Sequence, residues 1–331
     1  MSNLDIKLKK ISETLNKGIQ YGSLVVDIYG KDVNEVVVNT LRRGLFDIKP
    51  TYAYSFETID IEKNTTVFDN DIMRTRMEQL PIFDIDSKID YLDDMYWLDV
   101  DYTDNERKKH PDDNLNIELV VNVVNETSNI LDVTTHDAEF FINDKLSNNY
   151  KNKDPVLLIR LRPGEIFKCR ARGVLGIGRR NNIWSAVSTC YYDDYKDFAD
   201  NEEAHKIKLT IEGSGQMKEI DLLKKVCKTL NSKLDNVANI IKKKYYSANE
   251  KEKSIIIELD NETHTIGNII NDCLQNHKKV KSSGLSKPTP LMNQMIIQLE
   301  TIESNPLKIF FEAIEHAKTI FNKIEKECEK L

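Results

Sequence analysis

The chain has few of the residues that build disulfide-rich or zinc-binding domains. It contains five cysteines, and no two of them form a C-x-x-C pair. An odd count without this spacing argues against a disulfide framework and against a structural zinc site. A reducing compartment is the simpler setting. We therefore expect no metal and no cofactor.

Long apolar runs are also missing. Residues 1–18 mix both charges and have no apolar core, so they do not have the pattern of a signal peptide. No stretch approaches the roughly 20 apolar residues that a membrane-spanning helix needs. The sequence therefore argues against a secreted or membrane-bound protein, and no membrane partner is expected.

The short patterns of common catalytic sites are absent as well. The chain has no H-E-x-x-H, no G-x-S-x-G and no D-x-D-x-D segment. Gly173, Gly176 and Gly178 are not spaced as G-x-G-x-x-G, so a phosphate loop is not indicated. We expect no catalytic residues in this chain.

The charge balance points to protein partners. The 331 residues carry a formal net charge of −7, with 40% hydrophobic and 31% charged residues. This composition is typical of a globular chain of two domains, with room for a small third. An acidic chain as a whole is not built to coat nucleic acid, so any direct contact must come from a local patch. DNA is expected to be reached only indirectly, through a complex.

Apolar periodicity divides the chain into four parts. Residues 1–23 are predicted to form a helical extension, with Ile6, Ile11 and Leu15 on one side. Residues 24–50 predict a strand and a helix, and 205–247 a strand and a long helix over 219–246. Between them, residues 51–204 read as a β-rich insertion domain. Residues 254–331 predict strand, short helix, loop, strand and a final helix over 306–331.

Each long helix has apolar residues spaced by threes and fours, which is the pattern of a helix-packing seam. The predicted seam residues are Leu223, Val226, Leu230, Leu234, Val237, Phe310, Ile314, Phe321 and Ile324. The order strand, short helix, strand, long helix thus occurs twice, once split by the insertion and once at the end. Coincidence is the alternative, since such α+β units are common. A true repeat predicts an α+β fold in which two units pair through their long helices.

Several motifs resemble the alpha-type subunits of RNA polymerase, the family of the bacterial alpha, archaeal D and third-largest eukaryotic subunits. Residues 39–45, NTLRRGL, resemble its N-x-L-R-R motif, and residues 61–82 resemble its N-T-S-V and R-x-x-x-L-P-L pattern. The RPGE, GIGR and WSAV segments at 162–165, 176–179 and 184–187 are similar to three further family segments, and 212–215 to its E-S-x-G turn. Residues 260–268, DNETHTIGN, resemble the D-H-T-L-G-N motif of the small partner, the archaeal L or eleventh eukaryotic subunit. Fusion of the two partners looks like the arrangement in large cytoplasmic DNA viruses.

The resemblance implies a non-catalytic assembly platform for a DNA-directed RNA polymerase. Its expected partners are the second-largest and largest subunits and a small accessory subunit. The family's cysteine cluster is missing near 95–115, which agrees with the expectation of no metal. The protein is expected inside cells, in host cytoplasm and virion if viral or in the nucleus if cellular.

Six residues are candidates for the partner interface: Arg42, Arg43, Arg162, Arg172, Arg179 and Trp184. In the family, the second arginine of the N-x-L-R-R motif helps to bind the second-largest subunit, which favours Arg43 over a merely solvent-facing role. The basic stretch 156–180 has three interpretations: a solvated sheet face, a protein contact or a nucleic-acid contact. The last defines the alternative function, a free-standing nucleic-acid-binding transcription factor.

Overall fold

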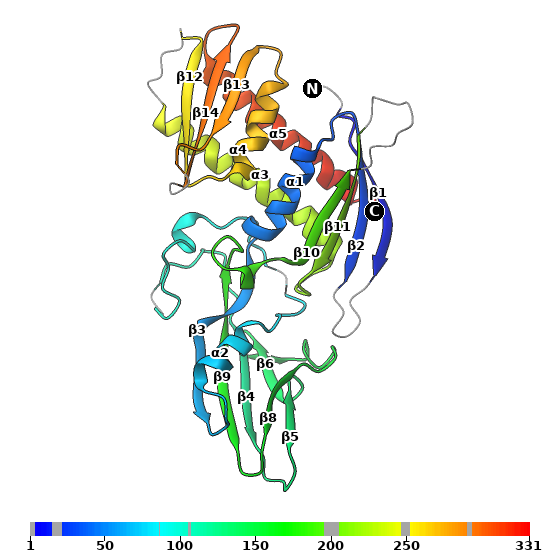
Figure 1. Ribbon diagram of the computed structural model, residues 1–331, viewed down its shortest axis with the longest axis vertical. Helices are drawn as coiled ribbons and strands as arrows, with labels where there is room; N and C mark the ends of the chain where they lie inside the picture. Colours follow the sequence, from blue (N-terminus) through cyan, green and yellow to red (C-terminus); the bar gives the residue numbers. More distant parts are fainter. Residues whose placement is uncertain are drawn as a thin grey trace.

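The computed structural model describes residues 4–14, 22–85, 87–104, 107–194, 205–245, 252–289 and 293–331. Figure 1 shows two α/β units beside each other and a β-rich domain that extends away from both. The mixed α and β composition expected from the sequence is confirmed.

The first unit joins two stretches of chain that lie on either side of the β-rich insertion. Its antiparallel sheet has the order β1-β2-β11-β10. The strands are β1 (Lys7–Thr14), β2 (Ser23–Gly30), β10 (Val187–Asp194) and β11 (His205–Gly213). Ile207 pairs with Ile28 and Leu209 with Val26, and all four side chains are buried. The alternation of apolar residues therefore directs one sheet face to the core.

Two helices cover that face, α1 (Glu35–Arg43) and α3 (Glu219–Lys244). Asn34 is the N-cap of α1, and its side chain accepts a hydrogen bond of 2.9 Å from the Val37 amide. It continues as a π-helical turn, Gly44–Ile48. A Cβ atom at Gly44 would lie 2.7 Å from Val226 Cγ2 on α3. Glycine at this position therefore allows α1 to approach α3 closely.

The second unit follows the same plan without an insertion. Its elements are β12 (Ser254–Asp260), α4 (His264–Gln275), β13 (Val280–Ser286), β14 (Gln294–Thr301) and α5 (Pro306–Cys328). The sheet order is β12-β14-β13, which matches β2-β11-β10 element for element. β1 is the extra strand of the first unit.

One core runs through both units. α3 packs on α5 and α1 on α4, while α5 also contacts β1 and α3 contacts β12. All nine residues of the predicted seam are buried in this single cluster. Each long helix therefore packs on the other helix and also contacts the sheet of the other unit (Figure 1).

The insertion domain has its own core. Its main sheet has the order β3-β9-β4-β6-β7, and a smaller one pairs β5 with β8. The elements are β3 (Thr51–Asn64), α2 (Asn70–Glu78), β4 (Ile117–Val124), β5 (Leu131–Thr134), β6 (Ala138–Ile142), β7 (Lys145–Ser147), β8 (Leu157–Leu161) and β9 (Ile166–Gly176). Short 3-10 turns lie at Asp94–Tyr96 and Asn182–Trp184.

The structure corrects three expectations. The predicted N-terminal helix is wrong over residues 4–14: residues 4–6 are not helical, and residues 7–14 form β1 on the edge of β2. Residues 1–3 and 15–20 of that prediction lie outside the described residues. β10 belongs to the sheet of the first unit, although a domain boundary at 204 assigned it to the insertion. Residues 280–286, expected as a loop, form edge strand β13. In all three cases the segment forms hydrogen bonds with the strand that follows it in the chain, β2, β11 or β14. The strand partner, rather than a local apolar pattern, therefore defines the element.

Candidate partner interface

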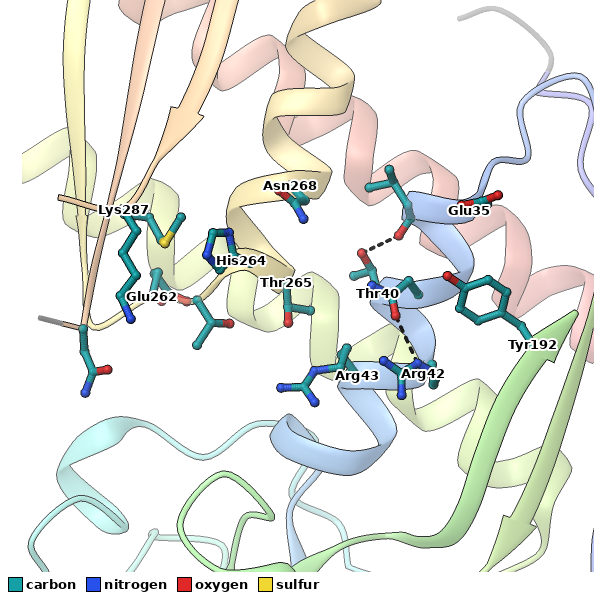
Figure 2. A pocket seen from close by; sticks show the side chains of 15 residues that line it. Glu35, Thr40, Arg42, Arg43, Tyr192, Glu262, His264, Thr265, Asn268 and Lys287 are labelled. Carbon is teal, nitrogen blue, oxygen red and sulfur yellow. Dashed lines mark hydrogen bonds between the residues drawn. The ribbon is translucent and has the colours of Figure 1, made fainter. Parts of the chain in front are cut away.

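The N-x-L-R-R-like and D-H-T-L-G-N-like motifs meet at one cleft, although more than 200 residues separate them. The cleft has a volume of about 510 Å³. Figure 2 shows Arg42 and Arg43 at the end of α1 on one side, and His264, Thr265 and Asn268 of α4 on the other. The contact between α1 and α4 creates this proximity.

Arg43 is held in place by the turn that follows its own helix. Its guanidinium Nη2 lies 2.6 Å from Asp47 Oδ2, and 43% of the arginine side chain remains exposed. Burial raises the pKa of Asp47, and the neighbouring Arg43, Arg179 and Arg42 limit that rise. The pair therefore orients Arg43 at the mouth of the cleft and leaves part of its surface open.

Arg179 connects three parts of the chain. Its amide donates to the Asp47 carbonyl at 3.0 Å, and its Nη1 donates to the Asn261 carbonyl at 2.8 Å. The guanidinium carbon also lies 5.7 Å from the Trp97 ring centroid. A Cβ at the preceding Gly178 would lie 1.8 Å from the Phe46 carbonyl oxygen, so only glycine permits this approach. The GIGR segment thus fastens the insertion domain to both units.

A buried ion pair lies beneath the cleft. Lys233 Nζ of α3 is 2.7 Å from Glu262 Oε1 of the second unit, and both side chains are less than 7% exposed. Burial disfavours the charged lysine, but Glu262 and Tyr91 outweigh it, so the pKa of Lys233 is raised. Tyr91 of the insertion domain accepts a 3.0 Å hydrogen bond from Asn236. This cluster joins all three domains.

The other four candidates, Arg179 among them, do not line the cleft. Arg162 lies in the exposed β8–β9 turn, at the end of β9 farthest from the units. Arg172 lies midway along β9, and Trp184 is only 2% exposed, with its Nε1 donating to the Val174 carbonyl at 2.9 Å. A buried side chain offers no contact surface, so the assignment of Trp184 to a partner interface is wrong.

Intrachain contacts account for much of the basic stretch. Arg170 pairs with Glu118 at 3.3 Å, and Arg160 with Asp132 at 2.9 Å. Arg180 donates to the carbonyls of Trp97 and Val100, and Phe167 is fully buried. These contacts leave no row of free cations along residues 156–180. They also leave no exposed aromatic ring there for base stacking.

The described residues include neither a metal-binding cluster nor a membrane-spanning helix. No group of three or more His, Cys, Asp or Glu side chains there is arranged to hold a metal ion. None of the helices in the described ranges combines the length and the apolar character needed to cross a membrane.

Sequence reasoning missed three groups at this site. Asp47 follows Arg43 by one helical turn, a spacing that signals an ion pair. Lys233 lies three residues after Leu230 and four before Val237, so the seam pattern already placed a lysine on a buried face. Tyr192 lines the cleft from β10, and no local signal indicates that placement.

Comparison with known proteins agrees with this geometry. Residues 254–327 match the RNA polymerase Rpb3/Rpb11 dimerisation domain. A protein of Acanthamoeba polyphaga mimivirus, named as a DNA-directed RNA polymerase subunit, is 24% identical over 97% of this chain and 93% of its own length. Rpo11, an RNA polymerase subunit of Sulfurisphaera tokodaii, is 32% identical over 24% of this chain and 87% of its own. Subunit rpac1 of RNA polymerases I and III from Dictyostelium discoideum is 25% identical over 57% of this chain and 52% of its own.

The fold and these similarities define a class, the subunits that dimerise to build multi-subunit RNA polymerases. The chain belongs to the alpha-type, Rpb3/Rpb11-like family of DNA-directed RNA polymerase subunits.

Proposed function

We propose that this polymerase subunit is an assembly platform in which both dimerising partners are halves of one chain. The observation that carries the proposal is the matched strand order of the two units, together with the packing of α3 on α5. The Rpb3/Rpb11 dimerisation domain matches the second unit alone, and the mimivirus relative aligns with nearly the full chain. Both similarities support a fused pair.

Fusion changes the thermodynamics of pairing. A short linker holds two modules at an effective concentration of about millimolar, so pairing no longer depends on the protein concentration. A single chain would then replace a heterodimer, rather than form a homodimer.

The platform would recruit the second-largest subunit and then the largest, with a small accessory subunit assisting. Arg43 is the proposed anchor, because its guanidinium is oriented by Asp47 and partly exposed. Arg42 lies beside it. Arg162 and Arg172 remain proposed contacts, whereas Arg179 already binds Asn261 within the chain. DNA would be reached only through the assembled enzyme, in host cytoplasm and virion, as the mimivirus similarity supports.

Affinity purification of the tagged chain from its native source, followed by mass spectrometry, tests this function. We expect both large polymerase subunits in stoichiometric amounts. Recovery of the chain alone, or with nucleic acid alone, would favour the nucleic-acid-binding alternative.

Arg43→Ala sharpens the same experiment. Loss of an interface anchor costs about 2 kcal/mol or more, so recovery of the second-largest subunit should fall about 30-fold. Arg43→Lys is the matched control, because lysine keeps the positive charge but lacks the planar guanidinium group. We expect it to recover only part of the binding. Equal recovery with all three proteins would remove Arg43 from the interface.

A further inference from the structure

The cleft between α1 and α4 has walls from both units. α1 contributes Asn39, Arg42 and Arg43, and the second unit contributes His264 and Asn268. Lys287, which follows β13, also lines it, and Figure 2 shows its side chain on the side of the cleft away from α1. His264 and Asn268 are exposed one helical turn apart, so they form one continuous surface of α4.

Arg42 and the exposed part of Arg43 make the α1 wall of this cleft basic. Arg42 is half-buried, and its Nε donates to Asn39 Oδ1 at 3.0 Å. Within the described ranges no carboxylate forms an ion pair with Arg42. Of the two glutamates that line the cleft, Glu262 is already paired with Lys233. The other, Glu35, lies at the far end of α1, about 10 Å along the helix from Arg42.

We propose that this cleft binds an acidic segment of the second-largest subunit, and that the segment contacts both units at once. The inference rests on the proposed function and adds the chemistry of the occupant and the participation of the second unit. Arg42, and the exposed part of Arg43 that its contact with Asp47 leaves open, match carboxylates in shape and charge, since a guanidinium donates parallel hydrogen bonds to them. The His264 and Asn268 side chains supply further polar contacts on the opposite wall. A cleft of about 510 Å³ holds only a few side chains, so a short segment is sufficient.

The shared walls have a consequence for assembly. The cleft is complete only when α1 and α4 are packed together, because neither unit supplies both sides. The acidic segment therefore binds the paired platform in preference to a chain whose units are apart. The second-largest subunit is then recruited preferentially by chains whose two units are correctly paired.

Charge variants of the tagged full-length chain test the proposal in its native source. Asn268→Glu places a carboxylate on the wall of the second unit, and Asn268→Gln has the same shape without the charge. We expect Asn268→Glu to reduce recovery of the second-largest subunit at least about tenfold, because opposed like charges across an interface are strongly unfavourable. Asn268→Gln, which keeps the amide and adds no charge, should reduce recovery far less than Asn268→Glu does. Arg42→Glu should act like Asn268→Glu, and Lys278→Glu, an exposed charge reversal beyond α4, should have no effect.

Crosslinking identifies the occupant directly. Asn268→Lys places an amine in the cleft, and a carbodiimide joins amines to carboxylates in direct contact. We expect an amide link from position 268 to an Asp or Glu of the second-largest subunit, and none from Gln275→Lys on the exposed end of the same helix.

The outcomes separate this proposal from the proposed function. If the unmodified chain recovers no large subunit, the assembly function itself is wrong. If it does, but Asn268→Glu and Asn268→Gln behave alike, or position 268 gives no such crosslink, the acidic-segment proposal is wrong and the platform function stands. A nucleic-acid strand in the cleft would show as a difference between the two variants that nuclease treatment abolishes, and that result also overturns the proposal.

Discussion

The two places where the units meet differ in character. Along α3 and α5 the contact is apolar and closed, and Leu230, Phe321 and their neighbours are fully buried. Between α1 and α4 the contact borders an open cleft with arginine, histidine and asparagine at its surface. The first contact has the composition of a domain core, and the second that of a recognition surface. We infer that the seam holds the two units together, and that the cleft binds a partner only when the units are paired.

The largest expected effect comes from breaking the seam. Leu230→Asp places a carboxylate in a site with no exposure, which should destabilise the fold by more than about 4 kcal/mol. We expect aggregation or loss of cooperative unfolding in circular dichroism, and the same for Phe321→Asp. Ile240→Asp is the matched control, because Ile240 lies on the same helix but is 43% exposed. Normal assembly of either seam variant would mean that the seam is assigned incorrectly.

The buried ion pair joins Lys233 of α3 to Glu262, which lies just before α4. Glu262→Gln leaves the Lys233 ammonium without a carboxylate, and we expect a loss of about 3–5 kcal/mol in urea unfolding. The double variant Lys233→Met with Glu262→Leu should regain most of it, because no charge is then left alone. Glu303→Gln removes an exposed pair with Lys279 and should not shift the midpoint. Equal behaviour of Glu262→Gln and Glu303→Gln would contradict the burial of the pair.

A second buried lysine provides a contrast with Lys233. Lys49 is fully buried and donates to the carbonyls of Pro50 and Ile89. Burial, and then Lys225, lower its pKa from 10.5 to about 7. The unfolded chain therefore binds more protons between pH 7 and 10.5, and stability rises with pH in that window.

The difference in unfolding free energy between the unmodified chain and Lys49→Met measures this effect. It should shift in favour of the unmodified chain by up to about 1.4 kcal/mol per pH unit above pH 7, and stay constant below pH 6. Lys88→Met, at an exposed neighbouring lysine, is the matched control for the loss of one lysine side chain. A constant difference across pH 6 to 8.5 would show that Lys49 is not desolvated.

The elements predicted well are those with a strong local period. The long helices expected at 219–246 and 306–331 are α3 and α5, since their apolar residues recur every three or four positions. The predictions for the segments that form β1 and β13 failed because these segments lack a strong local period. Their sequences, KLKKISET and VKSSGLS, are polar edge strands whose hydrogen-bond partners lie elsewhere in the chain.

The sequence indicated individual residues of the site, but not that they lie together. The motifs indicated Arg42 and Arg43 separately from His264, and only the packing of α1 on α4 brings them to one cleft. Trp184 was misassigned because an aromatic beside arginines has the same pattern in a core as on a binding surface. Burial distinguishes the two, and it depends on contacts far apart in sequence.

Cleavage of the linker tests the central claim most directly. A protease site placed between residues 245 and 252 would divide the chain into its two proposed partners after folding. The pairing account predicts that native mass spectrometry then detects both fragments as a one-to-one complex that still recovers the large polymerase subunits. Separation of the fragments under native conditions, with each remaining soluble, would contradict the claim that this chain is a covalently joined pair.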